Sequence, residues 1–335
     1  MEIVYNTLRM IKIVITANDA GQRLDRFLKK FLRRASLSGI YRIIRKDLKV
    51  NGKRAGEETI LAEGDELCFY MRGERFAELT RQVKKRAAKK QFKVAYEDEN
   101  VLIVEKPWGL LTHGDSREKK NTLMNQVCGY LQEKGEYDPA AEKSFTPSPV
   151  NRLDRNTTGL VIFGKNAAGL RFLTKLFRQR DTVYRYYMTL VAGNFRSEVV
   201  IEDSLAKDEN TNRVIVDEDG VYAKSIVRPV DNFKAFSLVE VELVTGRTHQ
   251  IRVHLASKGF PLAGDSKYGT SPRDRRANEK MRELGVTTQL LHACRLEFGN
   301  VSGNEFMPQG FEKLDGLVVE AELPEDFARV IEKIR

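Results

Sequence analysis

Two aspartates of this chain lie in the same tetrapeptide, Arg-Leu-Asp-Arg, and an ionised carboxylate at either place could serve a reaction. The first copy occupies residues 23–26 and the second occupies residues 152–155. Asp154 in the second copy precedes a hydroxyl-rich turn at residues 157–159, which leads into an apolar run at residues 160–163. Turns that feed buried strands often carry functional side chains, but a helix cap or an ion pair explains Asp154 equally well at this point.

A second group of chemically capable side chains follows the glycine at position 246, and it comprises Arg247, His249, Arg252 and His254. A metal site is the first possibility to test. The two histidines are five residues apart, so they point to opposite faces of a strand and lie about 140° apart around a helix. Neither arrangement brings them onto one ion, and no acidic or cysteine ligand has a useful spacing. We therefore expect no metal.

Other patterns exclude further classes of chemistry and indicate the compartment. The chain contains no GxSxG nucleophile elbow, and it contains neither GxxxxGK(S/T) nor GxGxxG, so no nucleotide cofactor is expected. Cys68, Cys128 and Cys294 are odd in number and widely spaced, which favours reduced thiols in a cytoplasmic protein. We see no secretory signal, and no apolar run approaches the roughly 20 residues of a membrane span.

The positive charge of the chain is concentrated in its first quarter. Residues 1–90 contain 22 lysines and arginines against 11 acidic residues, whereas the rest of the chain contains 35 against 36. Such asymmetry is typical of a polyanion-binding module attached to a near-neutral body. We favour nucleic acid as the polyanion over a basic membrane-surface arm or a merely solvated basic face.

The segment 11–72 is predicted to fold as a small module of two helices and a sheet. Alternating apolar residues indicate its strands, and apolar residues at helical spacing indicate two amphipathic helices. Asp25 would lie near the start of the first helix, where the helix dipole favours a negative charge without any catalytic role. The expected elements are a strand at 11–16, helices at 23–32 and 36–47, and strands at 48–55 and 63–70.

The same segment resembles the alpha-L RNA-binding motif, a module shared by a ribosomal small-subunit protein and many RNA-modifying enzymes. The matching sequences are RLDRFL, IYRIIRKD and VNGKR. Basic residues fall between the apolar positions, so both helices would present a mostly positive face. The resemblance implies RNA contacts by Arg23, Arg26, Arg42, Arg45, Lys49 and Lys53.

Beyond this module the chain changes character twice. Residues 73–91 are poor in apolar side chains and rich in lysine and arginine, which is typical of a basic linker or an exposed helix. Residues 92–335 alternate between strand and helix patterns without a charge excess. We therefore expect an α+β protein with a helix-helix-sheet RNA-binding module at 11–72, a linker at 73–91 and a catalytic domain at 92–335.

The larger domain resembles the RluA-type pseudouridine synthase family, in its ribosomal-RNA branch. Five sequences carry the resemblance in order: EDENVLIVEKPWGLLTHG, NRLDRNTTGLVIFGKN, VYRYYMTLVAG, GRTHQIRVHLASKGFPLAGDSKYG and LLHACRLEF. The family implies a mixed, mostly antiparallel sheet flanked by helices around a central catalytic cleft. It also implies isomerisation of uridine in RNA, in which the glycosidic N–C bond breaks, the uracil turns and a C–C bond forms.

By this resemblance, three residues carry the reaction. Asp154 is the essential aspartate, which acts either as a nucleophile at the anomeric carbon or by promoting a glycal intermediate. Arg247 is its cationic partner, which would hold the carboxylate in place and keep it ionised. Tyr187 aligns with the tyrosine that stacks on the uracil and serves as a base, with Tyr184 and Tyr186 as the alternatives.

The resemblance also implies how the RNA is engaged. A uridine in structured RNA must be flipped out, at a cost of a few kcal/mol in lost stacking. Arg152 is placed to fill the vacated space or to hold a phosphate, and Arg155 is a second expected RNA contact. A surface ion pair is the alternative role for Arg152. No metal or cofactor is needed, because the isomerisation is redox-neutral and releases nothing.

We expect large-subunit ribosomal RNA as the substrate of a monomeric, cytoplasmic enzyme that has no contact with membranes. A tRNA-directed synthase is the alternative within the same class. A non-catalytic RNA-binding factor of ribosome assembly is the alternative of another class. The joint presence of Asp154, Arg247 and Tyr187 argues against that second alternative.

Overall fold

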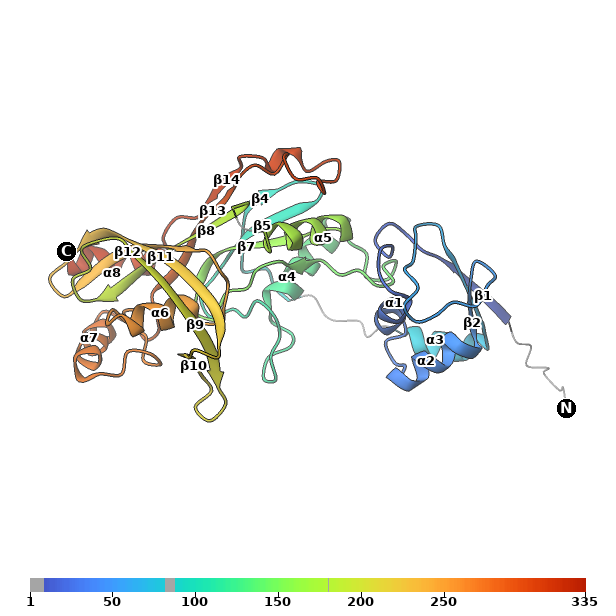
Figure 1. Ribbon diagram of the computed structural model, residues 1–335, viewed down its shortest axis with the longest axis horizontal. Coiled ribbons are helices and arrows are strands. Elements are labelled where there is room, and N and C mark those ends of the chain that lie inside the picture. Colours follow the sequence, from blue (N-terminus) through green and yellow to red (C-terminus); the bar gives the residue numbers. More distant parts are fainter. Residues whose placement is uncertain (1–8, 82–87, 180) are drawn as a thin grey trace. The chain divides into compact units, whose positions relative to one another are not determined.

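The structure is a computed structural model that describes residues 9–81, 88–179 and 181–335. Its helices and strands confirm the expected α+β class (Figure 1). Part of the expected basic linker, residues 82–87, lies outside the described residues. None of the helices in the described ranges has the length and the apolar character needed to cross a membrane.

The described residues form two compact units, and each unit is built from more than one stretch of chain. Two later segments therefore group with the N-terminal one. The domain boundaries expected at residues 72 and 91 stay a prediction. The first unit contains the described residues up to Lys90, Asn125–Ser148 and Gly164–Arg171, and the second contains Gln91–Met124, Pro149–Phe163 and Phe172–Arg335.

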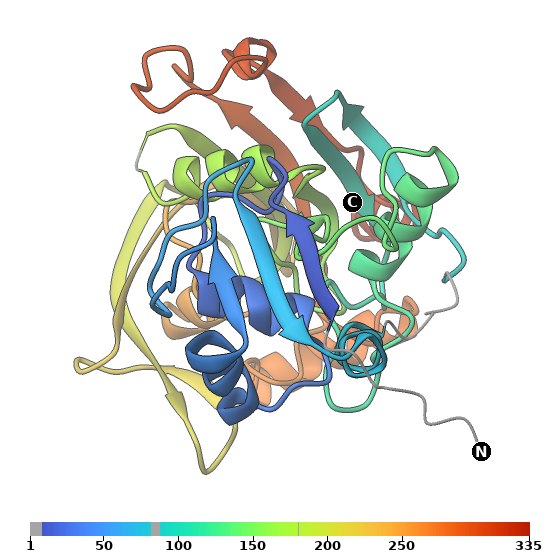
Figure 2. The same ribbon diagram turned by 90° about the vertical axis from the view of Figure 1, so that its right-hand side faces the viewer.

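The N-terminal part of the first unit has the expected strands and helices. Its strands form an antiparallel sheet in the order β1–β3–β2, and Figure 2 shows β3 between its two neighbours. The start of the expected linker forms a helix, α3, whose Phe76 and Leu79 pack against the core of this part, so it is not simply an exposed helix. The elements are β1 (Arg9–Val14), α1 (Leu24–Phe31), α2 (Leu37–Lys46), β2 (Leu48–Val50), β3 (Glu66–Met71) and α3 (Gly73–Thr80).

The apolar stripes of α1 and α2 build the core of this part. Phe27 of α1 and Ile43 of α2 are buried with Phe69 of β3 in one cluster. Burying side chains of this size stabilises the fold by roughly 1.5–3 kcal/mol each. The Ser36 hydroxyl accepts the backbone N–H of Gly39 at 3.2 Å, and it thereby caps α2. Helical periodicity in the sequence thus predicted this core correctly.

A buried carboxylate joins the later segments of the first unit to its N-terminal part. Asp19 is fully buried and accepts hydrogen bonds from Thr16 Oγ1 at 2.9 Å and from Ser144 Oγ at 2.7 Å. Gln22 Nε2 donates to Ser144 Oγ at 2.8 Å. The Asn18 side-chain oxygen accepts the backbone N–H of Ala167 at 3.0 Å. These contacts explain why segments beyond residue 124 belong to this unit.

The second unit is built on one large mixed sheet. Its strand order is β10–β9–β11–β12–β8–β13–β7–β5–β4, with β14 beside β13 and β6 beside β7. β13 and β7 are parallel, whereas β8, β9, β11 and β12 pair antiparallel. The strands are β4 (Lys93–Glu97), β5 (Val101–Lys106), β6 (Ser148–Pro149), β7 (Thr158–Gly164), β8 (Val183–Ala192), β9 (Val199–Asp208), β10 (Arg213–Val216), β11 (Val221–Asn232), β12 (Phe236–Leu243), β13 (Leu291–Phe298) and β14 (Val318–Glu320).

Helices cover this sheet at several places. Leu176 of α5 packs with Ile103 of β5 and Leu160 of β7, and Met281 of α7 packs with Leu190 of β8. α6 lies against β9, β10 and β11. The helices of this unit are the later part of α5 (Ala167–Leu176), α6 (Gln250–Ser257), α7 (Pro272–Glu283) and α8 (Glu325–Ile334), with a short 3-10 helix at Glu312–Leu314, whereas most of α4 (Leu123–Glu133) belongs to the first unit.

One glycine determines how closely β7 approaches β13. Gly159 has a φ of 105°, a backbone conformation that side chains other than glycine rarely adopt. A Cβ at this position would overlap the carbonyl of Ala293 on β13. The parallel pairing of the two strands therefore depends on glycine just after the loop that carries Asp154.

Candidate active site

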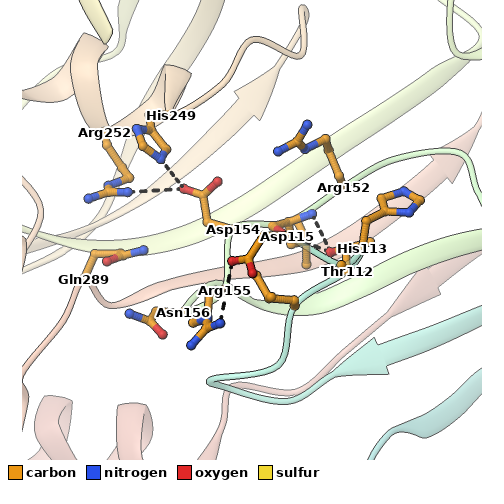
Figure 3. A pocket seen from close by; sticks show the side chains of 13 residues that line it. Thr112, His113, Asp115, Arg152, Asp154, Arg155, Asn156, His249, Arg252 and Gln289 are labelled. Atoms are coloured by element: carbon orange, nitrogen blue, oxygen red, sulfur yellow. Dashed lines mark hydrogen bonds and ion pairs between the residues drawn. The ribbon is translucent and has the colours of Figure 1, made fainter. Parts of the chain in front are cut away.

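A cavity of about 440 Å³ opens in the second unit around Asp154 (Figure 3). Its walls come from residues 111–115 after β5, residues 152–156 before β7, the start of α6, and Gln289. Sites for small molecules typically enclose roughly 300–1,000 Å³. The aspartate expected from the sequence thus faces a cavity that can hold a nucleoside.

The loop that carries Asp154 is fixed by hydrogen bonds on both sides. The Thr112 hydroxyl accepts the Leu153 N–H at 3.2 Å and donates to the Leu153 carbonyl at 3.0 Å. The Thr157 N–H donates to the Asp154 carbonyl at 3.1 Å. Asn151 Oδ1 accepts a backbone N–H of β7 at 2.9 Å. The Asp154 side chain, 25% exposed, is therefore presented to the cavity from a rigid support.

The cationic partner of Asp154 is Arg252, and not Arg247 as expected from the sequence. Arg252 Nη1 donates to Asp154 Oδ2 at 3.3 Å. Its Nε and Nη2 donate to the two oxygens of Asp265 at 2.7 and 3.0 Å, and its guanidinium lies 4.9 Å from the centre of the Tyr268 ring. Although burial opposes it, hydrogen bonding to Asp265 raises the pKa of Arg252. The guanidinium is thus charged, nearly buried and fixed in orientation.

Arg247 lies on the surface and serves the local backbone. It is exposed, and its Nε donates to the carbonyl of Tyr222 at 3.0 Å. The reason for the difference is the position of the helix start. α6 begins directly after His249, so His249 and Arg252 are three residues apart on one side of a helical turn. This spacing is the sequence signal that points to Arg252.

His249 faces the same carboxylate oxygen as Arg252. Its Nε2 lies 3.6 Å from Asp154 Oδ2, and its Nδ1 lies 2.7 Å from the Tyr268 hydroxyl. That hydroxyl also accepts the Val214 N–H at 3.2 Å, and we infer that it donates its own proton to His249 Nδ1. The neutral imidazole then carries its proton on Nε2, toward Asp154. The guanidinium of Arg252 and the imidazole of His249 thus both face Oδ2 of Asp154. No described residue forms a hydrogen bond with Oδ1 of Asp154.

The backbone and surroundings of His249 favour this fixed, neutral state. Its φ of 55° is in the left-handed region, which non-glycine residues rarely adopt. Burial lowers the pKa of His249; the charge of Asp154 opposes this shift, and Arg252 and Lys267 reinforce it. Residues held in such conformations cluster at functional sites. Sequence reasoning gave His249 no role, because its contacts come from segments distant in the chain.

Lys106, the last residue of β5, connects two walls of the cavity. Its Nζ donates to the carbonyls of Pro107 at 3.0 Å, Leu110 at 2.8 Å and Arg155 at 3.0 Å. Burial lowers the pKa of Lys106 to about 7, and the charge of Asp154 acts in the opposite direction. One buried side chain therefore holds the turn after β5 against the loop of Asp154.

Among the three neighbouring tyrosines of β8, Tyr187 is buried and is not among the residues that line the cavity of Asp154. Its side chain is 6% exposed. Burial raises the pKa of Tyr187 to about 12, and the charge of Asp154 contributes to this rise. Tyr184 and Tyr186 share the opposite face of the strand, where the Tyr186 ring lies 4.1 Å from the guanidinium of Arg295. The choice of Tyr187 over the two alternatives stays a prediction.

Arg152 and Arg155 both line the cavity, and neither pairs with Asp154. Figure 3 shows Arg152 beside His113, and partial burial together with the charge of Arg152 lowers the pKa of that histidine. Arg155 Nη2 lies 3.8 Å from Asp115 Oδ2, and its side chain is half exposed. Both guanidinium groups are positioned to meet phosphates of an RNA, and these roles stay predictions.

In the N-terminal tetrapeptide, unlike the second one, the aspartate forms hydrogen bonds with its own neighbours in the chain. Asp25 lies in the first turn of α1, and it accepts hydrogen bonds from Arg23 Nε at 3.1 Å, Arg23 Nη2 at 3.0 Å and the Arg26 N–H at 2.8 Å. These bonds, that of the Arg23 side chain foremost, lower the pKa of Asp25. Arg23 also pairs with Glu58 at 2.7 Å. The expected position of Asp25 at a helix start is confirmed.

The six basic residues of the first unit that were assigned to RNA binding differ in their surroundings. Arg23 is partly buried in the ion pairs just described, so its charge is neutralised within the unit. Lys49 Nζ lies 5.5 Å from the centre of the Tyr70 ring. RNA contacts by all six stay predictions, with Arg23 the least available. The exposed members are Arg26, Arg42, Arg45 and Lys53.

The described part of the chain contains no group of three or more His, Cys, Asp or Glu side chains that could hold a metal ion. His254, the second histidine weighed as a ligand, is fully buried in α6 with Nδ1 3.1 Å from the Ser225 hydroxyl. Burial lowers the pKa of His254 to about 4. This histidine therefore belongs to the packing of α6 against the sheet.

Comparison with known proteins points to one family. The sequence model of the family described as RNA pseudouridylate synthase matches residues 100–257, a stretch that includes Asp154, Tyr187 and Arg252. The chain is 34% identical over 295 residues to ribosomal large subunit pseudouridine synthase C of Vibrio parahaemolyticus, which covers 86% of this chain and 88% of the relative. It is 32% identical over 333 residues to the protein of the same name from Escherichia coli, with 97% of each chain covered.

A solved structure is similar in fold. The human protein RNA Pseudouridylate Synthase Domain Containing 4 superposes with a TM-score of 0.53 and 20% sequence identity, over 72% of this chain and 92% of that one. This likeness supports the expected architecture of the larger domain, a mixed and mostly antiparallel sheet with helices around a cavity.

Proposed function

The chain belongs to the RNA pseudouridylate synthase family and is a pseudouridine synthase, and we propose that its substrate is large-subunit ribosomal RNA. Two observations support this substrate. The relatives that match almost the whole chain are named ribosomal large subunit pseudouridine synthases. The basic excess of residues 1–90 fits a polyanion much larger than a single nucleotide.

The observation that carries the proposal is the state of the Asp154 carboxylate. One oxygen, Oδ2, is held by Arg252 and faced by His249, while Oδ1 has no hydrogen bond from a described residue. A carboxylate arranged in this way is oriented and still has a reactive oxygen. It lies in a cavity that can hold a nucleoside. We therefore assign the catalytic role to Asp154 Oδ1.

Two routes are open to this oxygen, and both balance. In one, Oδ1 forms a bond to C1′ while the N1–C1′ bond breaks and the uracil leaves with the bonding electrons. In the other, Oδ1 removes the proton at C2′, and loss of uracil gives a glycal. In both, C5 of the turned uracil then bonds to C1′; in the first route the Oδ1–C1′ bond breaks as this bond forms, and in the second the proton on Asp154 returns to C2′. C5 then loses its proton and N1 gains one. Arg252 keeps the carboxylate fixed throughout.

Tyr187 offers the uracil a buried ring and a hydroxyl group. Since the pKa of Tyr187 is raised to about 12, the hydroxyl is protonated at neutral pH. To accept the C5 proton, it must release its own proton in the same step. We propose that the ring packs on the uracil and the hydroxyl takes part in this transfer.

The remaining basic residues are proposed to hold the RNA. Arg152 would occupy the space that the flipped uridine leaves or bind a phosphate, and Arg155 would bind a neighbouring phosphate. The first unit would supply mostly sequence-independent affinity through counterion release. We propose a monomer that acts in the cytoplasm, and three widely spaced cysteines, odd in number, fit a reducing compartment.

Pseudouridine mapping in a strain that lacks the protein tests the proposal. We expect a defined uridine of large-subunit ribosomal RNA to lose its modification, and a plasmid copy of the wild type to restore it. Asp154→Asn should not restore it. Loss confined to tRNA would replace the proposed substrate by the tRNA alternative. An unchanged pattern in every RNA would favour the non-catalytic assembly factor.

A further inference from the structure

The turn after β5 carries an exposed indole that the reaction does not use. Trp108 is 60% exposed, although tryptophan is the largest side chain and usually is mostly covered. It is the one tryptophan in the sequence. The segment 107–109 ends a buried strand, and a tight turn explains its proline and glycine but not an exposed indole. This side chain therefore needs a separate explanation.

Hydrogen bonds hold both the Trp108 side chain and the turn that carries it. Its Nε1 donates to Thr288 Oγ1 at 3.1 Å, which fixes the edge of the ring. On the two sides of the turn, the carbonyls of Pro107 and Leu110 both accept hydrogen bonds from Lys106 Nζ, at 3.0 and 2.8 Å. A ring held by its edge and by its backbone loses little freedom on binding, so stacking on it is favourable.

A second cavity, of about 500 Å³, lies beside this indole. It shares Leu111 and Arg155 with the cavity of Asp154, so the two cavities adjoin. Trp108 is the single exposed large hydrophobic residue among its lining residues, and the others that face it include Arg117 and Arg155. An isolated ring among polar groups suits a nucleobase better than the extended apolar face of a protein partner.

The lining of this cavity includes two arginines, Arg117 and Arg155, and one carboxylate, Glu118, so it has one net positive charge. Its two nearby carboxylates are engaged by their own loop: Glu118 accepts the backbone N–H groups of Lys120 and Asn121 at 2.7 and 2.9 Å. Asp115 likewise accepts those of Arg117 and Glu118, at 2.8 and 2.7 Å. These bonds lower the pKa of both acids, and they stabilise the loop that presents the basic side chains.

We propose that Trp108 and this second cavity form a subsite for an unpaired nucleotide of the RNA substrate that neighbours the target uridine. The base stacks on the Trp108 ring, and its phosphate meets Arg117 and Arg155. The inference rests on the proposed function, because it names how the same RNA is held next to the cavity of Asp154. Stacking of this kind accepts any base, since every base has a π face.

The fluorescence of the single tryptophan reports directly on this subsite. The wild-type protein is titrated with a single-stranded adenosine decamer and with an abasic ribose-phosphate decamer of equal charge, and binding is followed independently by anisotropy of a dye at the RNA end. We expect the adenosine decamer to quench the emission and the abasic decamer to bind without quenching. Equal responses to both, or no quenching by either at saturation, would overturn the proposal.

Kinetics on a ribosomal RNA transcript give the second readout. Trp108→Leu should raise KM about tenfold and leave kcat within about twofold, and Trp108→Tyr should recover most of the lost affinity. Phe306→Leu is the matched control, because Phe306 is 56% exposed and lines neither cavity, and it should change neither constant. An unchanged KM in Trp108→Leu would also overturn the proposal.

The experiments distinguish a failure of the proposed ribosomal RNA substrate from a failure of the Trp108 subsite. If the wild type forms no pseudouridine in ribosomal RNA, the proposed substrate is wrong, whereas quenching by the adenosine decamer alone would still support the subsite. Arg117→Ala should lower the slope of log affinity against log salt by about one, as expected for a lost phosphate contact. An unchanged slope would exclude Arg117 from the subsite.

Discussion

The two Arg-Leu-Asp-Arg segments contain the same four residues and place their aspartates in opposite situations. Asp25 is bonded by its own neighbours: both of its oxygens accept hydrogen bonds from Arg23, and Oδ1 also accepts the Arg26 N–H. Asp154 has no such bond from Arg152 or Arg155. Its partner Arg252 comes 98 residues later and contacts one oxygen only.

This difference shows how a fold makes a carboxylate reactive. Local hydrogen bonds satisfy both oxygens of Asp25, which then serves the start of α1. In the second copy the flanking arginines form no hydrogen bond with Asp154. The distant Arg252 orients the carboxylate through Oδ2 and does not contact Oδ1. The four-residue sequence alone therefore does not determine whether its aspartate is catalytic. The function comes from the turn before β7 and from the start of α6, which the fold brings together.

Replacement of the distant partner is expected to have the largest effect among the site's supporting residues. Arg252→Ala should lower kcat roughly 10²–10³-fold, because it removes a preorganised charge at the reacting carboxylate. Arg247→Ala, the matched control from the same motif, should change kcat less than about threefold. Single-turnover assays give both values, and thermal unfolding separates catalysis from the loss of the Asp265 pair. Equal effects would restore Arg247 as the partner.

Removal of one hydroxyl tests the role of the buried tyrosine. Tyr187→Phe keeps the ring and should lower kcat about 100-fold if the hydroxyl takes part in proton transfer. Tyr186→Phe, on the opposite face of β8, should change kcat little. Full activity of Tyr187→Phe would reduce the role of Tyr187 to packing against the uracil.

The hydrogen bond from Tyr268 to His249 is expected to control the acid side of the pH profile. In the arrangement inferred for the wild type, the Tyr268 hydroxyl donates to His249 Nδ1, and burial further lowers the pKa of His249, so the imidazole stays neutral. In Tyr268→Phe, Nδ1 is free to take a proton. The charges around it are Asp154 and Asp265, which favour the imidazolium, and Arg252 and Lys267, which oppose it.

These groups determine the direction in which the acid limb of the pH profile should move. Without the hydrogen bond from Tyr268, His249 is protonated at a higher pH. The imidazolium that forms then withdraws negative charge from the Asp154 carboxylate through Oδ2. The acid limb of kcat should therefore move to higher pH in Tyr268→Phe, with kcat above neutral pH within about tenfold of the wild type. ¹⁵N NMR of the histidines checks the proton on Nε2. An unchanged acid limb together with an Nδ1 proton in the wild type would contradict this arrangement.

The smallest expected effects concern the first unit, whose basic residues are proposed to bind RNA through their charge and to take no part in the reaction. Arg42→Ala should lower the salt slope of RNA binding by about one, because Arg42 is exposed and lies outside the ion pairs of the described residues. Arg23→Ala should lower it less, since Arg23 already pairs with Asp25 and Glu58. Filter binding over a salt series measures both. A larger slope change for Arg23 would reverse their order.

Much of the fold was predictable because it depends on local periodicity. The apolar spacing around Phe27 and Ile43 predicted two helices, and Asn51 with Gly52 predicted the turn after β2, where both residues adopt positive φ. The resemblance to a known family also pointed to Asp154, which lines the cavity of the second unit, whereas Tyr187 is buried and is not among the lining residues. Patterns within a few residues were sufficient for these features.

The remaining features depend on contacts between distant segments. Arg252 was missed because its role follows from where α6 begins, and the roles of His249 and Lys106 follow from partners that the sheet brings near. The exposure of Trp108 depends on what the folded chain leaves uncovered. A single sequence carries the residue types at these positions but not their burial or their partners.

The most direct test compares the two aspartates in one assay. Wild type, Asp25→Asn and Asp154→Asn are purified, and pseudouridine formation in a large-subunit ribosomal RNA transcript is measured in a single turnover. The rate should fall roughly 10³-fold or more in Asp154→Asn. In Asp25→Asn it should stay within about twofold, with a stability loss below about 1 kcal/mol. A wild-type rate in Asp154→Asn, or an equal loss in both variants, would contradict the assignment of catalysis to the second tetrapeptide.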